Sequence, residues 1–228
     1  PLMQARNFNA EYESRVDELE SHPEIAFEKD FLRWMLSDGA GAVLLQDHPN
    51  QSGLSLRIDW LDILSFADQM PPCMYAGADM QDDTLRGWSR YDADERAKQS
   101  VMAIKQNVKL LNENIVKYTV EEALKHIMAR RELRLADIDW FLPHYSSEFF
   151  REPLAVGLAN VDLPIPMERW FTNLTSKGNT GAASIFIILE ELFNGGRLRS
   201  GQRLLCYVPE SGRFSSAFMH LTVVGNEA

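Results

Sequence analysis

Residues 97–131 form a stretch without proline or glycine, in which apolar residues recur at spacings of three and four. That period is typical of an amphipathic helix, so we predict one long helix or two abutting helices here. A short turn follows, and the apolar run over 135–144 predicts a buried strand. A helix that leads into a buried strand is a building unit of layered α/β folds.

The same alternation of helices and strands continues on both sides of this unit. Before it, apolar residues at mostly alternate positions predict a strand over 54–64, and the Pro, Gly and Asp residues of 65–95 predict a long surface loop. After it, we predict a helix over 146–159 and, beyond a connector broken by two prolines, a second helix that starts near Asn179. Two apolar runs separated by Gly212 predict a closing pair of strands.

The composition excludes several classes of protein. A formal net charge of -10 leaves no basic field that would attract phosphate backbones, so we exclude nucleic acid as a partner. No apolar run approaches the ~20 residues needed to cross a bilayer, and the polar first residues are unlike a signal peptide. We therefore expect a cytoplasmic protein that does not enter a membrane. Its two cysteines lie far apart without metal-ligand spacing, which argues against a disulfide framework and against a zinc site.

Three turns share one layout, in which a strand or connector ends, a polar or small residue follows, and another element begins. They are DWFLPHYSS, TSKGNTGAAS and VPESGRFSS. Loops beyond strand ends converge on a crevice in layered α/β folds, so we predict that His144, Asn179 and the turn Glu210–Arg213 are neighbours. Taken singly, the histidine is more often a structural hydrogen bonder and the asparagine a helix cap or turn residue.

The amino-acid sequences of these turns resemble those of a known protein family. Four segments resemble, in their order and approximate spacing, the later part of beta-ketoacyl-ACP synthase III, a member of the thiolase superfamily. They are LSDGAGAVLL, WFLPH, SKGNTGAASIFIILEEL and GRLRSGQRLLCY. The resemblance implies the layered αβαβα fold of the thiolases, built from two similar halves. Residues 1–48 would end the N-terminal half, and 49–228 would form the C-terminal half. We expect the small residues of SDGAGA to let two backbones approach closely.

The resemblance also implies which residues carry the chemistry. The family's catalytic histidine falls on His144 and its catalytic asparagine on Asn179. Neither Cys73 nor Cys206 matches the position of the family's nucleophilic cysteine, which we expect upstream of Pro1. The chain would then be the C-terminal portion of a longer synthase, and we expect it to be inactive alone.

The activity that the resemblance implies is a decarboxylating Claisen condensation. A cysteine takes an acyl group from a thioester, and a malonyl thioester loses CO2 to give an enolate that attacks the acyl-cysteine. A neutral imidazole and a side-chain amide would hold the thioester oxygen of the donor as negative charge builds there. The expected substrates are acyl-CoA and acyl- or malonyl-ACP, with no permanently bound cofactor and no metal. The expected partners are acyl carrier protein and a second copy of the full-length protein.

Two departures from the family put the substrate in question. PHYSS stands for the usual PHQAN, and PESGR for a Gly-rich closing turn, so the candidate substrate-binding residues are Tyr145, Ser146, Glu210, Ser211, Gly212 and Arg213. Arg213 has two possible roles. It could form an ion pair with Glu210 inside this turn, or it could pair with a carboxylate of an acyl chain or partner. The alternatives are acyl transfer to another nucleophile, condensation of two ketoacyl thioesters in secondary metabolism, and a non-catalytic partner subunit of a synthase.

Overall fold

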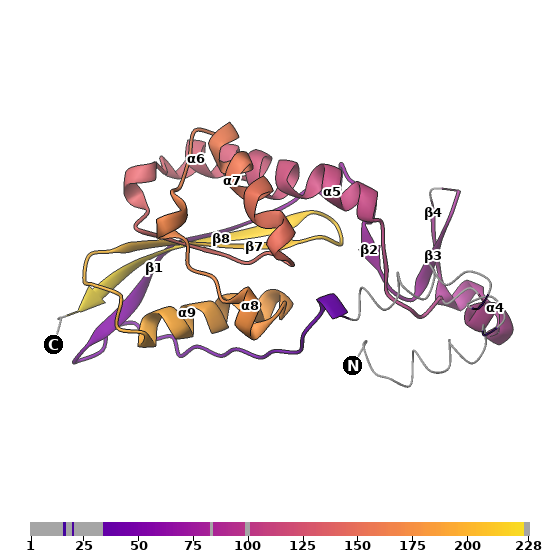
Figure 1. The fold of residues 1–228 in the computed structure, drawn as a ribbon, viewed down its shortest axis with the longest axis horizontal. Coiled ribbons are helices and arrows are strands. Elements are labelled where there is room, and N and C mark those ends of the chain that lie inside the picture. The colour runs from indigo at the N-terminus through magenta and orange to yellow at the C-terminus, as the bar shows by residue number, and fades with distance from the viewer. Residues whose placement is uncertain (1–15, 17–19, 21–33, 83, 99–100, 226–228) are drawn as a thin grey trace.

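A computed structural model describes residues 16, 20, 34–82, 84–98 and 101–225 of the chain. Its centre is a four-stranded mixed sheet with helices on both faces (Figure 1). The strand order is β1(Leu54–Ser65), β8(Ser215–Gly225), β7(Arg203–Glu210) and β6(Trp140–Pro143). Only the pair β6 and β7 is parallel among these neighbours, and the other pairs are antiparallel. The predicted α/β class and these four strands are thus confirmed.

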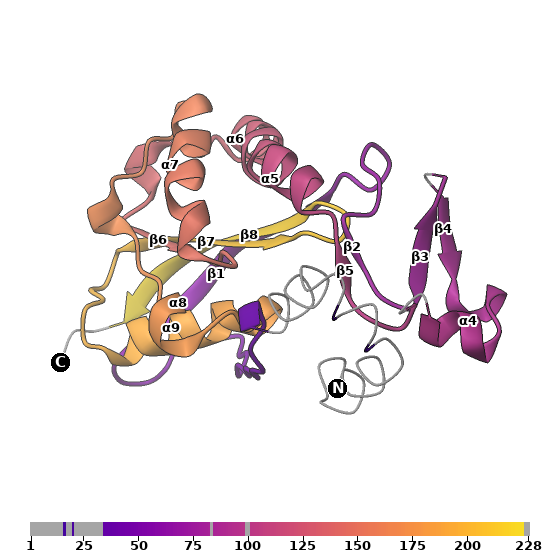
Figure 2. The same cartoon turned by 45° about the vertical axis from the view of Figure 1, so that its right-hand side comes forward.

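Two layers of helices cover the sheet, as Figure 2 shows most clearly. On one face lie α5(Val108–Val116), a π-helical turn over Lys117–Glu122, α6(Ala123–Arg131) and α7(Arg151–Asn160). On the other face lie α8(Leu174–Lys177) and α9(Ser184–Asn194). Each face has its own apolar core: Phe141 and Phe218 are buried with the first layer, and Leu142 and Leu204 with α9. Alternate residues of β6 therefore contribute to different cores, as the pleat of a strand requires.

The long helix predicted over 97–131 is confirmed only from Val108 onward. Before it, Lys105–Gln106 forms the short strand β5, which pairs with β2(Met74–Tyr75). Asn107 then caps α5, because its side chain accepts a hydrogen bond from the amide of Leu110 at 2.9 Å. The prediction was wrong for the first residues because the apolar period continued across this cap.

The helix is continuous through Arg131, but its middle turn is π-helical. Thr119 explains the wider turn, since its hydroxyl donates to the carbonyl of Ile115 at 2.5 Å and lies 2.7 Å from the hydroxyl of Tyr207 on β7. A threonine that bonds back to a carbonyl one turn earlier competes with the regular helical ladder. The buried hydroxyl pair ties the first helical layer to the sheet.

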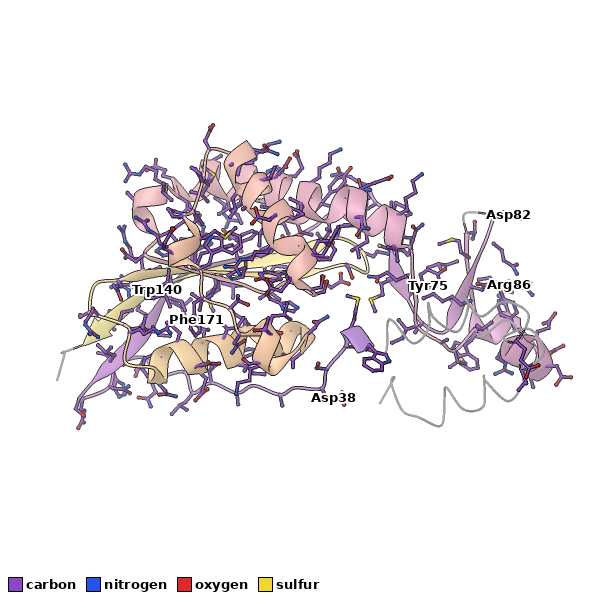
Figure 3. All side chains as sticks on the ribbon, in the orientation of Figure 1. Asp38, Tyr75, Asp82, Arg86, Trp140 and Phe171 are labelled. Atoms are coloured by element: carbon purple, nitrogen blue, oxygen red, sulfur yellow. The ribbon has the colours of Figure 1, made fainter. Side chains whose placement is uncertain are left out.

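The surface loop predicted over 65–95 is wrong in its second half. There the chain forms a hairpin of β3(Ala78–Gln81) and β4(Thr84–Gly87), a 3-10 turn over Trp88–Arg90, and the short helix α4(Ala93–Lys98). The hairpin projects from the body of the molecule (Figures 1 and 3). Asp82 begins its turn with a φ of 46°, in the left-handed region that aspartate tolerates better than most residues.

The segment of small residues runs along α9, as expected for a close approach of two backbones (Figure 1). A Cβ atom added at Gly39 would lie 2.6 Å from the Thr180 side chain, and one added at Gly41 would overlap Phe186. The amide of Ser37 donates to the carbonyl of Asn179 at 2.8 Å. This segment thereby fixes the turn that precedes α9.

Candidate active site

His144 directly follows β6 and is held there by the neighbouring strand. Its backbone amide donates to the carbonyl of Tyr207 at 2.8 Å, which extends the parallel pairing by one residue. The side chain is 7% exposed, and burial lowers the pKa of the imidazole to about 4. Within the described part of the chain the ring has no hydrogen-bond partner. At neutral pH, His144 is therefore an uncharged imidazole whose N–H is available to a ligand.

Asn179 lies in the turn between α8 and α9. Gly178 ends α8 with a φ of 79°, and a Cβ there would also overlap Ser37, so only glycine fits this approach. The Asn179 carboxamide oxygen accepts a hydrogen bond from the amide of Gly181 at 3.3 Å, and its NH2 group has no partner among the described residues. The residue is 7% exposed. A single accepted bond thus orients the amide and leaves its donor side free.

The prediction that Asn179 opens a helix is wrong. A 3-10 turn over Gly181–Ala183 comes first, and α9 begins at Ser184. Because the helix dipole acts mainly within the first turn, it contributes little to a ligand at Asn179. The amide is positioned by the Gly178 turn and by the backbone bond to Ser37 instead.

The polypeptide leading to Asn179 runs beside the outer edge of β6. Trp170 forms a parallel bridge with Phe141, and the amide of Phe171 donates to the carbonyl of Phe141 at 2.9 Å. The rings of Trp140 and Phe171 meet edge to face with centroids 6.5 Å apart (Figure 3). Since parallel strands present their carboxyl ends at one edge of a sheet, His144 and the segment that continues from Phe171 toward Asn179 leave the sheet at the same edge.

The start of α8 is tied to α9 by a side-chain bond that the sequence did not reveal. Asn173 donates from Nδ2 to the carboxylate of Glu191 at 2.7 Å, and its backbone carbonyl accepts from the amide of Lys177. Glu191 is itself exposed on α9. Asn173 stands two residues after Phe171, the second residue of the apolar pair WF, and six residues before Asn179, and this spacing carries no recognisable signal.

The turn after β7 extends farther along the sheet than His144. Tyr207 pairs with Pro143, so Glu210 lies three residues beyond that register, roughly 10 Å along the strand. The Glu210 carboxylate accepts hydrogen bonds from the turn's own amides, those of Gly212 and of Arg213, the latter at 3.2 Å. The Arg213 guanidinium donates to the carbonyl of Ala67 at 3.4 Å.

These hydrogen bonds differ from the ion pair between Arg213 and Glu210 that the sequence suggested for the closing turn. Glu210 caps the turn, and within the described residues the Arg213 side chain bonds to a backbone carbonyl rather than to Glu210. The Ser211 hydroxyl lies 3.7 Å from the sulfur of Met74, and the carbonyl of Gly212 accepts from the amide of Cys73 at 2.8 Å. The turn is thus packed on the segment after β1.

Tyr145 and Ser146, predicted to bind substrate, differ in their surroundings. Tyr145 is 3% exposed and belongs to the core under the first helical layer. Its hydroxyl donates to Glu148 at 3.2 Å, and burial raises the pKa of the phenol to about 12. Ser146 is half-buried.

Neither cysteine has the environment of a nucleophile. Cys73 is fully buried, its sulfur lies 3.4 Å from the carbonyl of Asn107, and burial raises the pKa of the thiol to about 11. Cys206 is also buried, inside β7, where burial raises the pKa of its thiol as well. A thiol attacks as the thiolate, so these two residues are held in the unreactive form.

The chain is similar in sequence to known synthase III proteins. Residues 128–213 match a family described as the C terminal of 3-oxoacyl-[acyl-carrier-protein (ACP)] synthase III. The chain is 31% identical to beta-ketoacyl-[acyl-carrier-protein] synthase III of Laribacter hongkongensis over 185 residues, which cover 73% of this chain and 55% of that protein. It is 29% identical to synthase III 3 of Streptomyces coelicolor over 178 residues, which cover 75% of this chain and 46% of that protein. The chain thus spans about half the length of the curated relatives it matches.

Solved structures agree on the fold. The synthase III of Thermus thermophilus superposes with a TM-score of 0.54 at 21% identity, covering 78% of this chain and 49% of that one. The synthase III of Aquifex aeolicus gives a TM-score of 0.51 at 20% identity, covering 72% and 44%. At such identities the likeness establishes the thiolase-like fold alone. Within the described residues, no helix is both long and apolar enough to cross a bilayer.

Proposed function

We propose, from the premise that this chain is a beta-ketoacyl-ACP synthase III-like protein of the thiolase superfamily, that it is the donor-binding C-terminal part of a condensing acyltransferase. The observation that carries the proposal is that His144 and Asn179 are both buried and that, among the described residues, the imidazole ring and the amide NH2 group have no hydrogen-bond partner. The proposed halves divide at residues 48 and 49. The reaction would extend an acyl thioester with a malonyl thioester.

In this mechanism the two donors stabilise the enolate of the malonyl group. The bond to the carboxylate breaks, CO2 leaves, and its electron pair remains on the donor as an enolate whose charge lies on the thioester oxygen. A neutral His144 N–H and the Asn179 NH2 would hold that oxygen, and removal of one such donor lowers kcat by about 10²- to 10³-fold. The low pKa of His144 keeps the imidazole neutral, so it donates without transferring a proton to the enolate.

We infer that the nucleophile comes from sequence outside these 228 residues. Its thiolate would take the acyl group from acyl-CoA or acyl-ACP and release the carrier thiol. The enolate carbon of malonyl-ACP then attacks the acyl carbonyl, the carbon–sulfur bond breaks, and the thiolate leaves again. The unreactive environments of Cys73 and Cys206 support this inference.

Exposed apolar residues support a second half that packs on this one. Leu61 and Ile63 of β1 are 50% and 72% exposed, and Leu44 and Leu45, in the segment before β1, are 82% and 71% exposed. Large exposed apolar side chains are a feature of surfaces that bind other protein parts. Acyl carrier protein would be the transient partner, and the whole protein would form a homodimer.

Mass spectrometry of condensation products tests the proposal. The whole protein, given malonyl-ACP and a series of acyl-CoA primers, should form a 3-oxoacyl product, and the purified 228-residue chain should form none. His144→Ala and Asn179→Ala should each reduce product formation by at least about 10²-fold. Product from the isolated chain, or full activity of either variant, would show the proposal to be wrong.

A non-catalytic partner subunit is the second candidate, and the buried cysteines are the observation that favours it. If no cysteine elsewhere in the whole protein becomes acylated by acyl-CoA, the chain would stabilise a paired synthase rather than catalyse. Peptide mapping of the acylated protein decides between the two, because an acyl-cysteine outside residues 1–228 requires the enzyme.

A further inference from the structure

We propose that Asn173 is a positioning residue, whose hydrogen bond to Glu191 holds the start of α8 against α9 and thereby keeps the Asn179 amide in place. This role deepens the proposed function and rests on it, because it concerns the placement of one of the two proposed donors. Asn173 acts through the backbone that leads to Asn179 and makes no contact with substrate.

The Asn179 side chain makes too few bonds of its own to fix its position. Its carboxamide oxygen accepts one hydrogen bond, from the amide of Gly181 at 3.3 Å, and that bond lies within the same turn. The position of the amide therefore follows the backbone of the loop formed by residues 173–184, which contains α8 and ends where α9 begins.

Packing holds α8 only weakly. The helix is four residues long, and none of its residues is buried. Leu174 is partly buried against the core that contains Phe141, whereas residues 175–177 are exposed. A segment with so little buried apolar surface opens at a low cost in free energy, so a polar contact at its start strongly affects where it lies.

The side chain of Asn173 supplies that contact. Asn173 is 8% exposed and stands at the N-cap of α8, yet its side chain makes no hydrogen bond to the amides of that helix, as an N-cap asparagine usually does. Instead, Nδ2 donates to the carboxylate of Glu191 at 2.7 Å. Glu191 belongs to α9, which lies beside α8 in Figures 1 and 2. A hydrogen bond to a charged acceptor is about twice as strong as a neutral one, so this bond is a firm link between the two helices.

The backbone carries this anchor to Asn179. The carbonyl of Asn173 accepts from the amide of Lys177 at 2.9 Å, which closes the single turn of α8, and Gly178 and Asn179 follow directly. The carbonyl of Asn179 accepts from the amide of Ser37 at 2.8 Å. The loop thus has one anchor before the donor and one at the donor itself. Without the first anchor α8 can move about the second, and a displacement of about 1 Å can cost about 10²-fold in rate.

The test is CO2 release from a malonyl thioester by the whole protein, with kcat and KM measured separately. Asn173→Asp places two carboxylates opposite each other, so kcat should fall about 10- to 100-fold while KM changes less than about twofold. Adding Glu191→Gln to this variant restores the bond with donor and acceptor exchanged, and kcat should return to within about threefold of that of the unchanged protein. A general loss of packing would not be repaired by this exchange.

Asn194→Asp is the matched control. Asn194 donates from Nδ2 to the carboxylate of Glu190 at 2.8 Å, which is the same chemistry on the same helix. That bond joins two exposed residues of α9 and anchors no other element. The kcat of Asn194→Asp should therefore stay within about twofold of that of the unchanged protein.

Three results would overturn the positioning role. They are a kcat for Asn173→Asp within about twofold of the unchanged value, a loss that Glu191→Gln fails to repair, and a raised KM at constant kcat, which would mean that Asn173 contacts substrate instead. If Asn173→Asp fails to fold, Glu191→Ala provides the measurement, because it removes the acceptor at an exposed position; the same loss of kcat is expected, and an unchanged kcat overturns the role.

The rate of Asn179→Ala separates this inference from the proposed function. If Asn179→Ala releases CO2 as fast as the unchanged protein, the proposed function is wrong and the positioning role falls with it. If Asn179→Ala is slow and Asn173→Asp is fast, the positioning role alone is wrong.

Discussion

The buried imidazole of His144 predicts a specific dependence of stability on pH. Burial lowers its pKa from 6.5 to about 4 in the folded chain, whereas the unfolded chain keeps the higher value. Above pH 6.5 the histidine is neutral in both states and contributes nothing to the pH dependence. As the pH falls below 6.5 the unfolded state binds a proton that the folded state does not accept until about pH 4, so stability is lost across this window.

The size of the loss follows from the two pKa values. From pH 7.5 to pH 5, proton binding to the unfolded state lowers the free energy of unfolding by about 2 kcal/mol. Carboxylates with a lowered pKa, such as those of Asp59 and Asp62, lose their stabilising contributions only at lower pH, as the pH falls through their folded values. The window between pH 6.5 and pH 5 therefore reports mainly on histidine.

Urea unfolding at both pH values, followed by tryptophan fluorescence, measures this loss. His144→Gln is the control, because glutamine has a similar polar shape and does not titrate, and every other ionisable group is unchanged. We expect the unchanged chain to lose about 2 kcal/mol more than His144→Gln on acidification. Equal losses in the two proteins would refute a buried neutral imidazole.

Three further predictions concern the packing and the thiols. Asp62→Asn should lower the free energy of unfolding by about 1–2 kcal/mol, because this carboxylate accepts two hydrogen bonds from the partly exposed Arg131; a urea midpoint close to that of the unchanged chain would contradict it. Gly157→Ala should destabilise by about 1–3 kcal/mol despite the higher helix propensity of alanine, because its methyl group would overlap Val116; a raised melting temperature would show that the helices can separate at no cost. At pH 8, Cys73 should react with an aromatic disulfide reagent only after unfolding, since the pKa of its thiol is about 11, and rapid labelling of the folded chain would count against its burial.

The sheet and the main helices could be predicted because their apolar periods end at clear boundaries. Glycine and proline mark the ends of α9 and the closing strands, and alternation identified β1 despite a bulge between Ile58 and Trp60. The start of α5 was predicted too early, although Asn107 is a recognisable capping residue, because the apolar period runs past it. The β3–β4 hairpin was missed because its strands are four residues each, too short for alternation to show.

The sequence allows the residues of a site to be proposed, but it does not predict the contacts that hold those residues in place. His144 and Asn179 follow from the order of motifs along the chain. The path of the chain from β6 toward Asn179 depends on a single parallel bridge, between Phe141 and Trp170, which leaves no periodic signal in the sequence. The core position of Tyr145 was not predictable either, because a tyrosine after a strand end is equally compatible with a solvent-facing turn.

Release of labelled CO2 from a malonyl thioester tests the central claim most directly, because it isolates the step assigned to His144 and Asn179. We predict that the whole protein releases CO2 even when the cysteine proposed as the nucleophile is replaced by glutamine. His144→Ala and Asn179→Ala should each lower that rate by at least about 10²-fold, without change in the fold as judged by circular dichroism. Unchanged CO2 release by either variant would contradict the assignment of that residue as an oxyanion donor.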